Sequence, residues 1–346
     1  MTSLTDLPPE LLLQIIEACR LTGGSLVSLM LTTKSLHDLG CRILHARLRF
    51  TSNAQLVHFM SLNHDFHLAC PIQSIEIDLP GGASGRGLFL LIRNCLEQCQ
   101  RMAQEHAQLD EDGRILIDSL CFCLNSHAYD AYRHLENAIK LVNPLSFVWT
   151  GPDPPHHFST AIVPGAARAL FGALSTCTRL QSIAISSIAM PEPALLADDN
   201  TPTPPPFALP HMPSLRRLYI AQAVFLDPAA VARFALRYVS ALAASDAYRA
   251  AWGEGGRGPL LEKIRLVDAY RESIWGPRLR RADVVGAGVA LWKQARKEPA
   301  EFIGVETAEE RAVRDALTAL VSCEARTERI MGGDRALEQN QDGLLE

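Results

Sequence analysis

A short phrase of alternating apolar residues recurs along the chain and limits its possible folds more than any other feature. The phrase Leu-x-x-(Ile/Leu)-x-(Ile/Leu) begins at Leu180, Leu215 and Leu261. The same kind of alternation also occurs in segments 72–77, 117–124 and 145–149. Alternation over four to eight residues is typical of a β-strand that buries one face. The sequence therefore predicts a sheet built from many short strands.

Helix-like stretches lie between these predicted strands, in segments 87–109, 129–142, 166–174 and 228–244. Strand and helix alternate, with 35 residues from Ile183 to Leu218 and 46 from Leu218 to Ile264. This pattern predicts an α/β fold in which β/α units stack as a solenoid with one parallel sheet. A doubly wound α/β domain is the alternative. The two differ in whether consecutive strands are nearest neighbours in the sheet.

The first 50 residues have a different pattern. Pro8 favours the start of a helix, and Gly23-Gly24 favours its end. Between them, apolar residues fall on one helix face, at positions 11, 12, 15, 16 and 19. Ser25 and Thr33 are good N-caps for a second and a third short helix. Because three helices in so short a segment form only a minimal bundle, we expect part of its apolar surface to meet a partner or the rest of the chain.

The bundle resembles an F-box, and the match is closest to the F-box-like proteins of fungi. The matching pattern is Leu4-x-x-Leu7-Pro8-x-Glu10-Leu11-Leu12-x-x-Ile15-Ile16 and then Leu26-x-x-Leu29-x-Leu31-x-x-Lys34. The resemblance implies that the bundle docks onto the Skp-type adaptor of SCF (Skp/cullin) ubiquitin ligases. It also implies which positions contact that adaptor: Leu7, Pro8, Leu11, Leu12, Ile15, Ile16, Leu26 and Leu29.

Two other interpretations of the bundle remain open from the sequence. In the first, the helices only cap the apolar end of the repeats that follow. In the second, they form a helix-turn-helix whose basic residues face DNA. The sequence disfavours the second, because the basic residues at positions 34, 42, 47 and 49 are spread around the third helix and the whole chain is acidic.

The region after the bundle resembles an irregular leucine-rich-repeat array without the asparagine ladder of regular repeats. We expect a helical domain at residues 1–50, a repeat domain at 51–331 and a flexible polar tail at 332–346. Residues 191–213 hold eight of the 21 prolines and are expected to form an exposed insertion. A last helix, at about 308–329, is expected to close the array as a C-terminal cap.

The composition excludes several classes of partner. A formal charge of −5 and a pI near 6.1 leave no general basic field for nucleic acid or an anionic membrane. The chain has no uninterrupted apolar run of about 20 residues, and its N-terminus lacks the basic region of a signal peptide. We therefore expect a cytoplasmic or nuclear protein.

Catalytic and metal-binding motifs are missing from the sequence. The nine cysteines have no zinc-finger spacing, which favours free thiols. The pattern Gly82-x-x-x-x-Gly87 has the glycine spacing of a phosphate loop, but Leu88 and Phe89 replace its Lys and Ser/Thr. No Gly-x-Ser-x-Gly elbow occurs either. We expect no enzyme activity, no cofactor and no metal site.

These observations lead to one functional hypothesis and one alternative. The chain is expected to be a substrate receptor of an SCF-type ubiquitin ligase, in which the bundle binds the Skp-type adaptor and the repeats bind a target protein of unknown identity. The alternative is a repeat-type interaction scaffold with no role in ubiquitin ligation.

Overall fold

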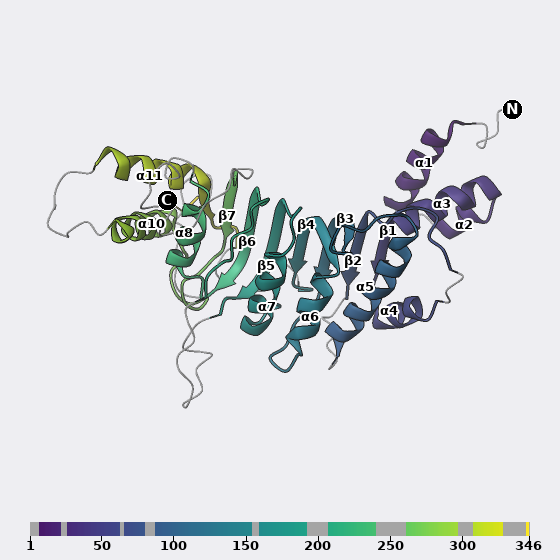
Figure 1. Ribbon diagram of the computed structural model, residues 1–346, viewed down its shortest axis with the longest axis horizontal. Helices are drawn as coiled ribbons and strands as arrows, with labels where there is room; N and C mark the ends of the chain where they lie inside the picture. The colour runs from purple at the N-terminus through teal and green to yellow at the C-terminus, as the bar shows by residue number, and fades with distance from the viewer. Residues whose placement is uncertain are drawn as a thin grey trace.

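A helical bundle, a long parallel sheet and a final group of helices follow one another along an elongated molecule (Figure 1). The computed structural model describes residues 7–21, 26–62, 66–79, 87–153, 159–191, 207–239, 261–296, 307–327 and 344–345. Three predicted features lie outside these residues: the end of the first helix at Gly23-Gly24, the helix cap Ser25 and the glycine-rich segment 80–86.

The bundle consists of three helices, α1 (Pro9–Leu21), α2 (Leu26–Met30) and α3 (Lys34–Ala46). Thr33 caps α3 as predicted, because its hydroxyl accepts a hydrogen bond from the Leu36 amide at 3.2 Å. The third helix was expected to continue through Leu48. It ends instead at Ala46, and the chain passes directly into the first strand.

Eight strands form one sheet in which every neighbouring pair is parallel. They are β1 (Arg47–Phe50), β2 (Ser74–Asp78), β3 (Ile115–Cys123), β4 (Val142–Thr150), β5 (Ser182–Ala189), β6 (Arg217–Val224), β7 (Lys263–Val267) and β8 (Val321–Glu324). Their order in the sheet is their order in the chain. Consecutive strands are therefore nearest neighbours, which confirms the solenoid and rules out the doubly wound alternative.

Helices cover one face of this sheet (Figure 1). They are α4 (Asn53–Met60), α5 (Leu88–Gln104), α6 (Tyr132–Ile139), α7 (Pro164–Leu174), α8 (Pro228–Leu236), α10 (Arg281–Ala295) and α11 (Ala308–Leu320). The apolar side of each strand packs against them, so one continuous core extends from Leu48 to Leu345. The predicted fold class, α/β with N-terminal helices followed by a leucine-rich-repeat-like solenoid, is confirmed.

A ladder of polar side chains joins successive repeats in place of the missing asparagine ladder. Gln108 accepts a hydrogen bond from the Ile72 amide at 2.9 Å and donates to the Leu116 carbonyl at 2.7 Å. Buried Asn143 donates to Asp110 at 2.8 Å and accepts from the Arg179 amide at 3.1 Å. The bond to Leu116 is local, but the other three contacts join residues that are 33 to 36 positions apart in the sequence. These three contacts therefore reproduce the spacing of the repeat.

Three predictions about the later repeats differ from the structure. Residues 321–324 form β8 and end the sheet, whereas the last helix was expected to continue to 329. Part of the proline-rich segment is not exposed, because Leu209 and Met212 are buried in the main core. In the tail, Leu345 is only 2% exposed, and its amide donates to the Cys323 carbonyl at 2.8 Å. β8 forms because residues 321–324 pair with β7, and in the other two cases a few apolar side chains outweigh the polar composition around them.

Within the described ranges, no helix is both long enough and apolar enough to cross a bilayer.

Candidate functional site

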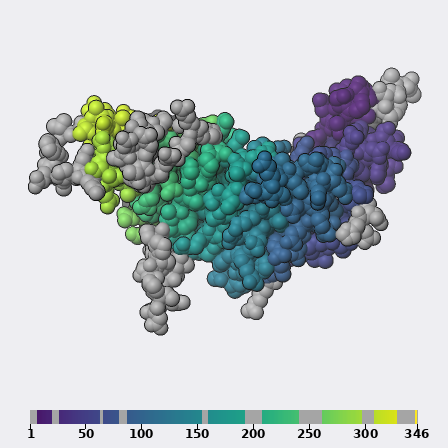
Figure 2. Space-filling model, in the orientation of Figure 1, coloured from purple at the N-terminus to yellow at the C-terminus, as the bar shows by residue number. Residues whose placement is uncertain are grey.

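The bundle has a small core of its own. Leu12, Ile16, Leu26 and Leu36 form a buried cluster that is separate from the main core. The bundle lies at the N-terminal end of the solenoid, where Figure 2 shows it as a projection from the body of the molecule. The downstream repeats therefore leave the outer surface of the bundle open.

The eight residues predicted to contact an adaptor separate into two groups. Leu12, Ile16 and Leu26 are buried within the bundle, and Leu7 and Leu29 pack against the same cluster. The core of the bundle accounts for the apolar character of these five positions. A rigid partner has little access to the buried side chains of Leu12, Ile16 and Leu26, whereas Leu7 and Leu29 are partly exposed.

The other three predicted residues lie outside that cluster. Pro8 and Leu11 are exposed, and Ile15 is half-buried. Their spacing of i, i+3 and i+7 places them along one side of the start of α1. The Leu11 side chain is 44% exposed, which is high for a leucine in a folded helix.

More apolar side chains are exposed on the other two helices of the bundle. Val27 is 62% exposed, Leu31, just after α2, is 80% exposed, and Leu44 on α3 is 41% exposed. With Leu11, these make four of the eight large apolar side chains that are exposed in the described part of the chain. The bundle therefore carries half of the large apolar side chains that are exposed in the described residues, spread over α1, α3 and the segment that begins at α2.

Close packing between α2 and α3 fixes part of this surface. Gly40 is buried on α3, and a β-carbon built at this position would collide with the side chain of Met30. A larger residue at this position would force the Met30 side chain to move, so glycine favours the close approach of α2 and α3. The approach holds α2 in place while Val27 and Leu31 remain exposed.

Polar contacts connect the bundle to the first repeats. Arg47, at the start of β1, forms an ion pair with Glu17 on α1. The thiol of Cys70 donates to the Arg42 carbonyl at 3.1 Å, and the Ala69 amide donates to Nδ1 of His45 at 2.8 Å. Burial lowers the pKa of His45, so the neutral ring that accepts this bond is favoured.

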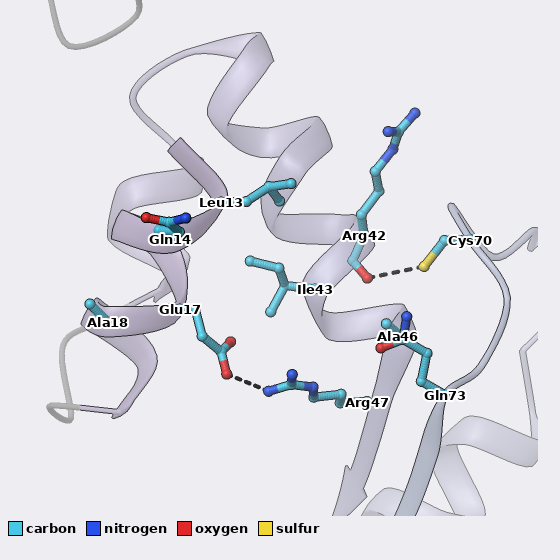
Figure 3. A pocket seen from close by; sticks show the side chains of 10 residues that line it. All are labelled: Leu13, Gln14, Glu17, Ala18, Arg42, Ile43, Ala46, Arg47, Cys70 and Gln73. Atoms are coloured by element: carbon cyan, nitrogen blue, oxygen red, sulfur yellow. Dashed lines mark hydrogen bonds and ion pairs between the residues drawn. The ribbon is translucent and has the colours of Figure 1, made fainter. Parts of the chain in front are cut away.

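A groove of about 560 Å³ lies at this junction, between α1, α3 and the segment before β2. Figure 3 shows Leu13 and Ile43 on its inner side and the Glu17–Arg47 pair closing one end. Cys70 and Gln73 supply the side formed by the solenoid. The groove marks the boundary between the two cores and is lined mostly by aliphatic atoms.

Metal ligation and reactive thiols are two kinds of site chemistry on which the described residues bear. These residues contain no group of three or more His, Cys, Asp or Glu side chains that could hold a metal ion. Burial raises the pKa of the Cys177 thiol to about 11 and that of Cys323 to about 12. These two thiols are therefore protonated and shielded near neutral pH.

Comparison with known proteins adds no family assignment. No protein-family model matches the chain, and no curated protein sequence matches it. The class of protein is therefore defined by the fold alone: N-terminal helices followed by a parallel α/β repeat array.

Sequence reasoning did not single out the exposed residues Val27, Leu31 and Leu44 as a group. Val27 and Leu31 are four residues apart, so they lie on one side of α2, away from buried Leu26. This spacing was available in the sequence as a signal for a second apolar face. The groove at the junction had no such signal, because its walls come from three separate segments, 13–18, 42–47 and 70–73.

Proposed function

We propose that this chain is a substrate receptor of an SCF-type ubiquitin ligase, in which the bundle binds a Skp-type adaptor and the solenoid binds a target protein. The observation that carries this proposal is the exposed apolar surface of a bundle with its own core. Its support from the sequence is the resemblance of residues 4–48 to an F-box.

The exposed residues supply enough apolar area for an interface. Complete burial of one Leu, Ile or Val side chain contributes about 1.5–3 kcal/mol before the costs of association. Leu11, Val27, Leu31 and Leu44 are already ordered on a folded scaffold, so binding them loses less conformational entropy than binding a flexible segment.

The structure narrows the roles proposed for the eight predicted residues. We assign direct contact with the adaptor to Pro8, Leu11 and Ile15, which lie outside the buried cluster. Leu12, Ile16 and Leu26 support the interface from within, because their packing sets the positions of the three helices.

The junction gives the proposed receptor a defined geometry. Arg47 and Cys70 connect the bundle to the first repeats, and α3 continues into β1 without a linker. A target on the solenoid is then held at a fixed distance from the adaptor. Such a receptor acts by proximity, because it raises the effective concentration of the target near the ubiquitin-loaded enzyme without reacting itself.

The test is binding of the full chain to a purified Skp-type adaptor, with one surface variant and a matched control. Leu11→Asp places a charge on the proposed interface, and Leu90→Asp places the same charge at a leucine of similar exposure, 38%, on α5. We expect Leu11→Asp to weaken binding at least about tenfold and Leu90→Asp to change it less than about twofold. Ile16 is unsuitable as the test position, since a charge at a fully buried residue would unfold the bundle.

Two results would favour the scaffold alternative. One is that the wild-type chain and the adaptor elute separately. The other is that Leu11→Asp and Leu90→Asp bind the adaptor equally well.

A further inference from the structure

We propose that a pocket beside the last two strands of the sheet binds an acidic side chain of a target peptide. The side chain is either a carboxylate or a phosphorylated serine. This inference extends the proposed function, because it gives the chemistry of one part of the target. The pocket has a volume of about 320 Å³ and lies beside β7, β8 and the first residue of α10. Its polar lining comes from Lys263, Arg265, Arg281, Ser322 and Glu324.

The single carboxylate of the pocket is already neutralised. Glu324 accepts two hydrogen bonds from Arg265, at 2.5 Å from Nε and 2.6 Å from Nη2. These bonds lower the pKa of Glu324 and raise that of Arg265. The guanidinium of Arg265 also lies over the ring of Tyr219, 5.5 Å from its centre. Arg265 and Glu324 therefore form a fixed wall of the pocket with no net charge.

Two cations next to this wall have no counter-charge. Lys263 is paired in register with Arg217 on β6, so two positive side chains lie side by side on the exposed face of the sheet. Neither side chain has a hydrogen bond or ion pair with any described residue. Like charges in directly opposed positions are unfavourable. An anionic group from another molecule would relieve this repulsion.

A buried hydroxyl in the pocket also has no partner. The Oγ atom of Ser322 is inaccessible to solvent and makes no hydrogen bond within the described chain. A buried polar group left unpaired costs about 1–3 kcal/mol. A bound carboxylate or phosphate would meet the exposed side chain of Lys263, and a small shift of Ser322 would let its hydroxyl donate to the same ligand.

The end of the chain holds the pocket in shape. The amide of Leu345 donates to the Cys323 carbonyl at 2.8 Å, and its own carbonyl accepts from the Arg281 amide at 3.0 Å. Leu344 and Leu345 both line the pocket. They connect β8 to the start of α10, so the backbone on this side of the pocket is held in place before any ligand binds.

The surroundings of the pocket favour a discrete acidic residue of a peptide over a polyanion. Glu76 and Asp78 lie on the same exposed face, near its other end, and the chain carries a net charge of −5. Both carboxylates are paired with Arg49, so this end of the face carries no excess of positive charge for a nucleic acid to follow. Three small side chains, Ser119, Ser146 and Ser182, lie in one row of the sheet that continues to Arg217 and Lys263 beside the pocket. An extended peptide can approach the sheet closely along this row.

The test uses three fluorescein-labelled peptides of one sequence, with serine, glutamate or phosphoserine at the centre. Binding to the full chain is measured by fluorescence anisotropy, without an adaptor. The result is therefore independent of whether the bundle binds one. We expect the glutamate or phosphoserine peptide, or both, to bind at least about tenfold more tightly than the serine peptide. Binding of phosphoserine alone would identify the target residue as phosphorylated.

Two variants locate the binding. Lys263→Gln removes a charge from the pocket, and Lys140→Gln removes one from an exposed i,i+4 ion pair on the other side of the sheet. We expect Lys263→Gln to weaken acidic-peptide binding about tenfold and Lys140→Gln to change it less than about twofold. The proposal is overturned if no acidic peptide saturates below about 1 mM, if all three bind equally, or if the two variants behave alike.

Discussion

The bundle and the solenoid stabilise themselves in different ways. The solenoid packs eight strands and the helices on one face into a continuous core, in which each repeat is supported by its neighbours. The bundle has four buried apolar side chains in its core and exposes as many large ones. The comparison shows that apolar side chains left exposed for a partner cannot also contribute to the core of the bundle. We therefore expect the bundle to be the less stable of the two.

The largest loss of stability is expected from a substitution in the middle of the solenoid. Trp149 is fully buried, donates from Nε1 to the Leu124 carbonyl at 3.0 Å and contacts the rings of Phe89 and Phe122. Trp149→Ala should lower the free energy of unfolding by about 3–5 kcal/mol, because it leaves a cavity and an unpaired carbonyl. Chemical denaturation measures this loss. Trp275→Ala is the control, since its side chain is 65% exposed and its removal should cost less than about 0.5 kcal/mol.

The next effect should be confined to the bundle. Ile16→Ala removes a fully buried side chain and should destabilise the bundle by about 2–4 kcal/mol. Hydrogen exchange should become fast in α1, α2 and α3 while the strands β3–β6 keep their protection. Equal acceleration in both regions would show instead that the two cores unfold as one unit. Leu11→Ala, at an exposed position of the same helix, should leave both patterns unchanged.

A smaller effect is expected from the polar ladder. Asn143→Ala leaves Asp110 and the Arg179 amide without their partner in a buried position. The free energy of unfolding should fall by about 1–3 kcal/mol. Asn137→Ala, on the exposed side of α6, is the matched control. If both variants unfold at the same denaturant concentration, the ladder does not stabilise the repeats.

The smallest effect concerns the junction between the two regions. Burial lowers the pKa of His45 in the folded chain. The neutral ring therefore makes its full contribution to the free energy of folding above the unfolded pKa of about 6.5. This contribution is lost as the pH falls through that value toward the folded pKa, because the unfolded state then binds the proton more readily. We expect the Ala69 amide, which donates to His45, to exchange faster at about pH 5 than at pH 7 after correction for intrinsic rates. In His45→Gln this extra acceleration should disappear.

The sequence predicted the regular parts of the fold well. The phrases beginning at Leu180, Leu215 and Leu261 predicted β5, β6 and β7, because alternation directly reports a strand with one buried face. Short strands at the two ends were missed. β1 and β8 each have four residues, adjoin a helix and depend on pairing with a neighbouring strand, which no local pattern reports.

The candidate binding surface was only partly predictable. The sequence identified the apolar stripe of α1, but it did not separate Leu11 from Leu12, which differ by a single position in the helix. The distinction depends on where α2 and α3 pack. The pocket at β7 and β8 had no signal at all, since its lining residues come from segments up to about 80 positions apart.

Hydrogen exchange of the full chain, with and without a purified Skp-type adaptor, tests the central claim most directly. We predict that the adaptor slows exchange in α1 and α2, around Leu11 and Val27, and leaves the strands of the solenoid unchanged. Unchanged exchange in the bundle at saturating adaptor, or protection that appears only on the solenoid, would contradict the claim that the exposed side of the bundle is the adaptor-binding surface.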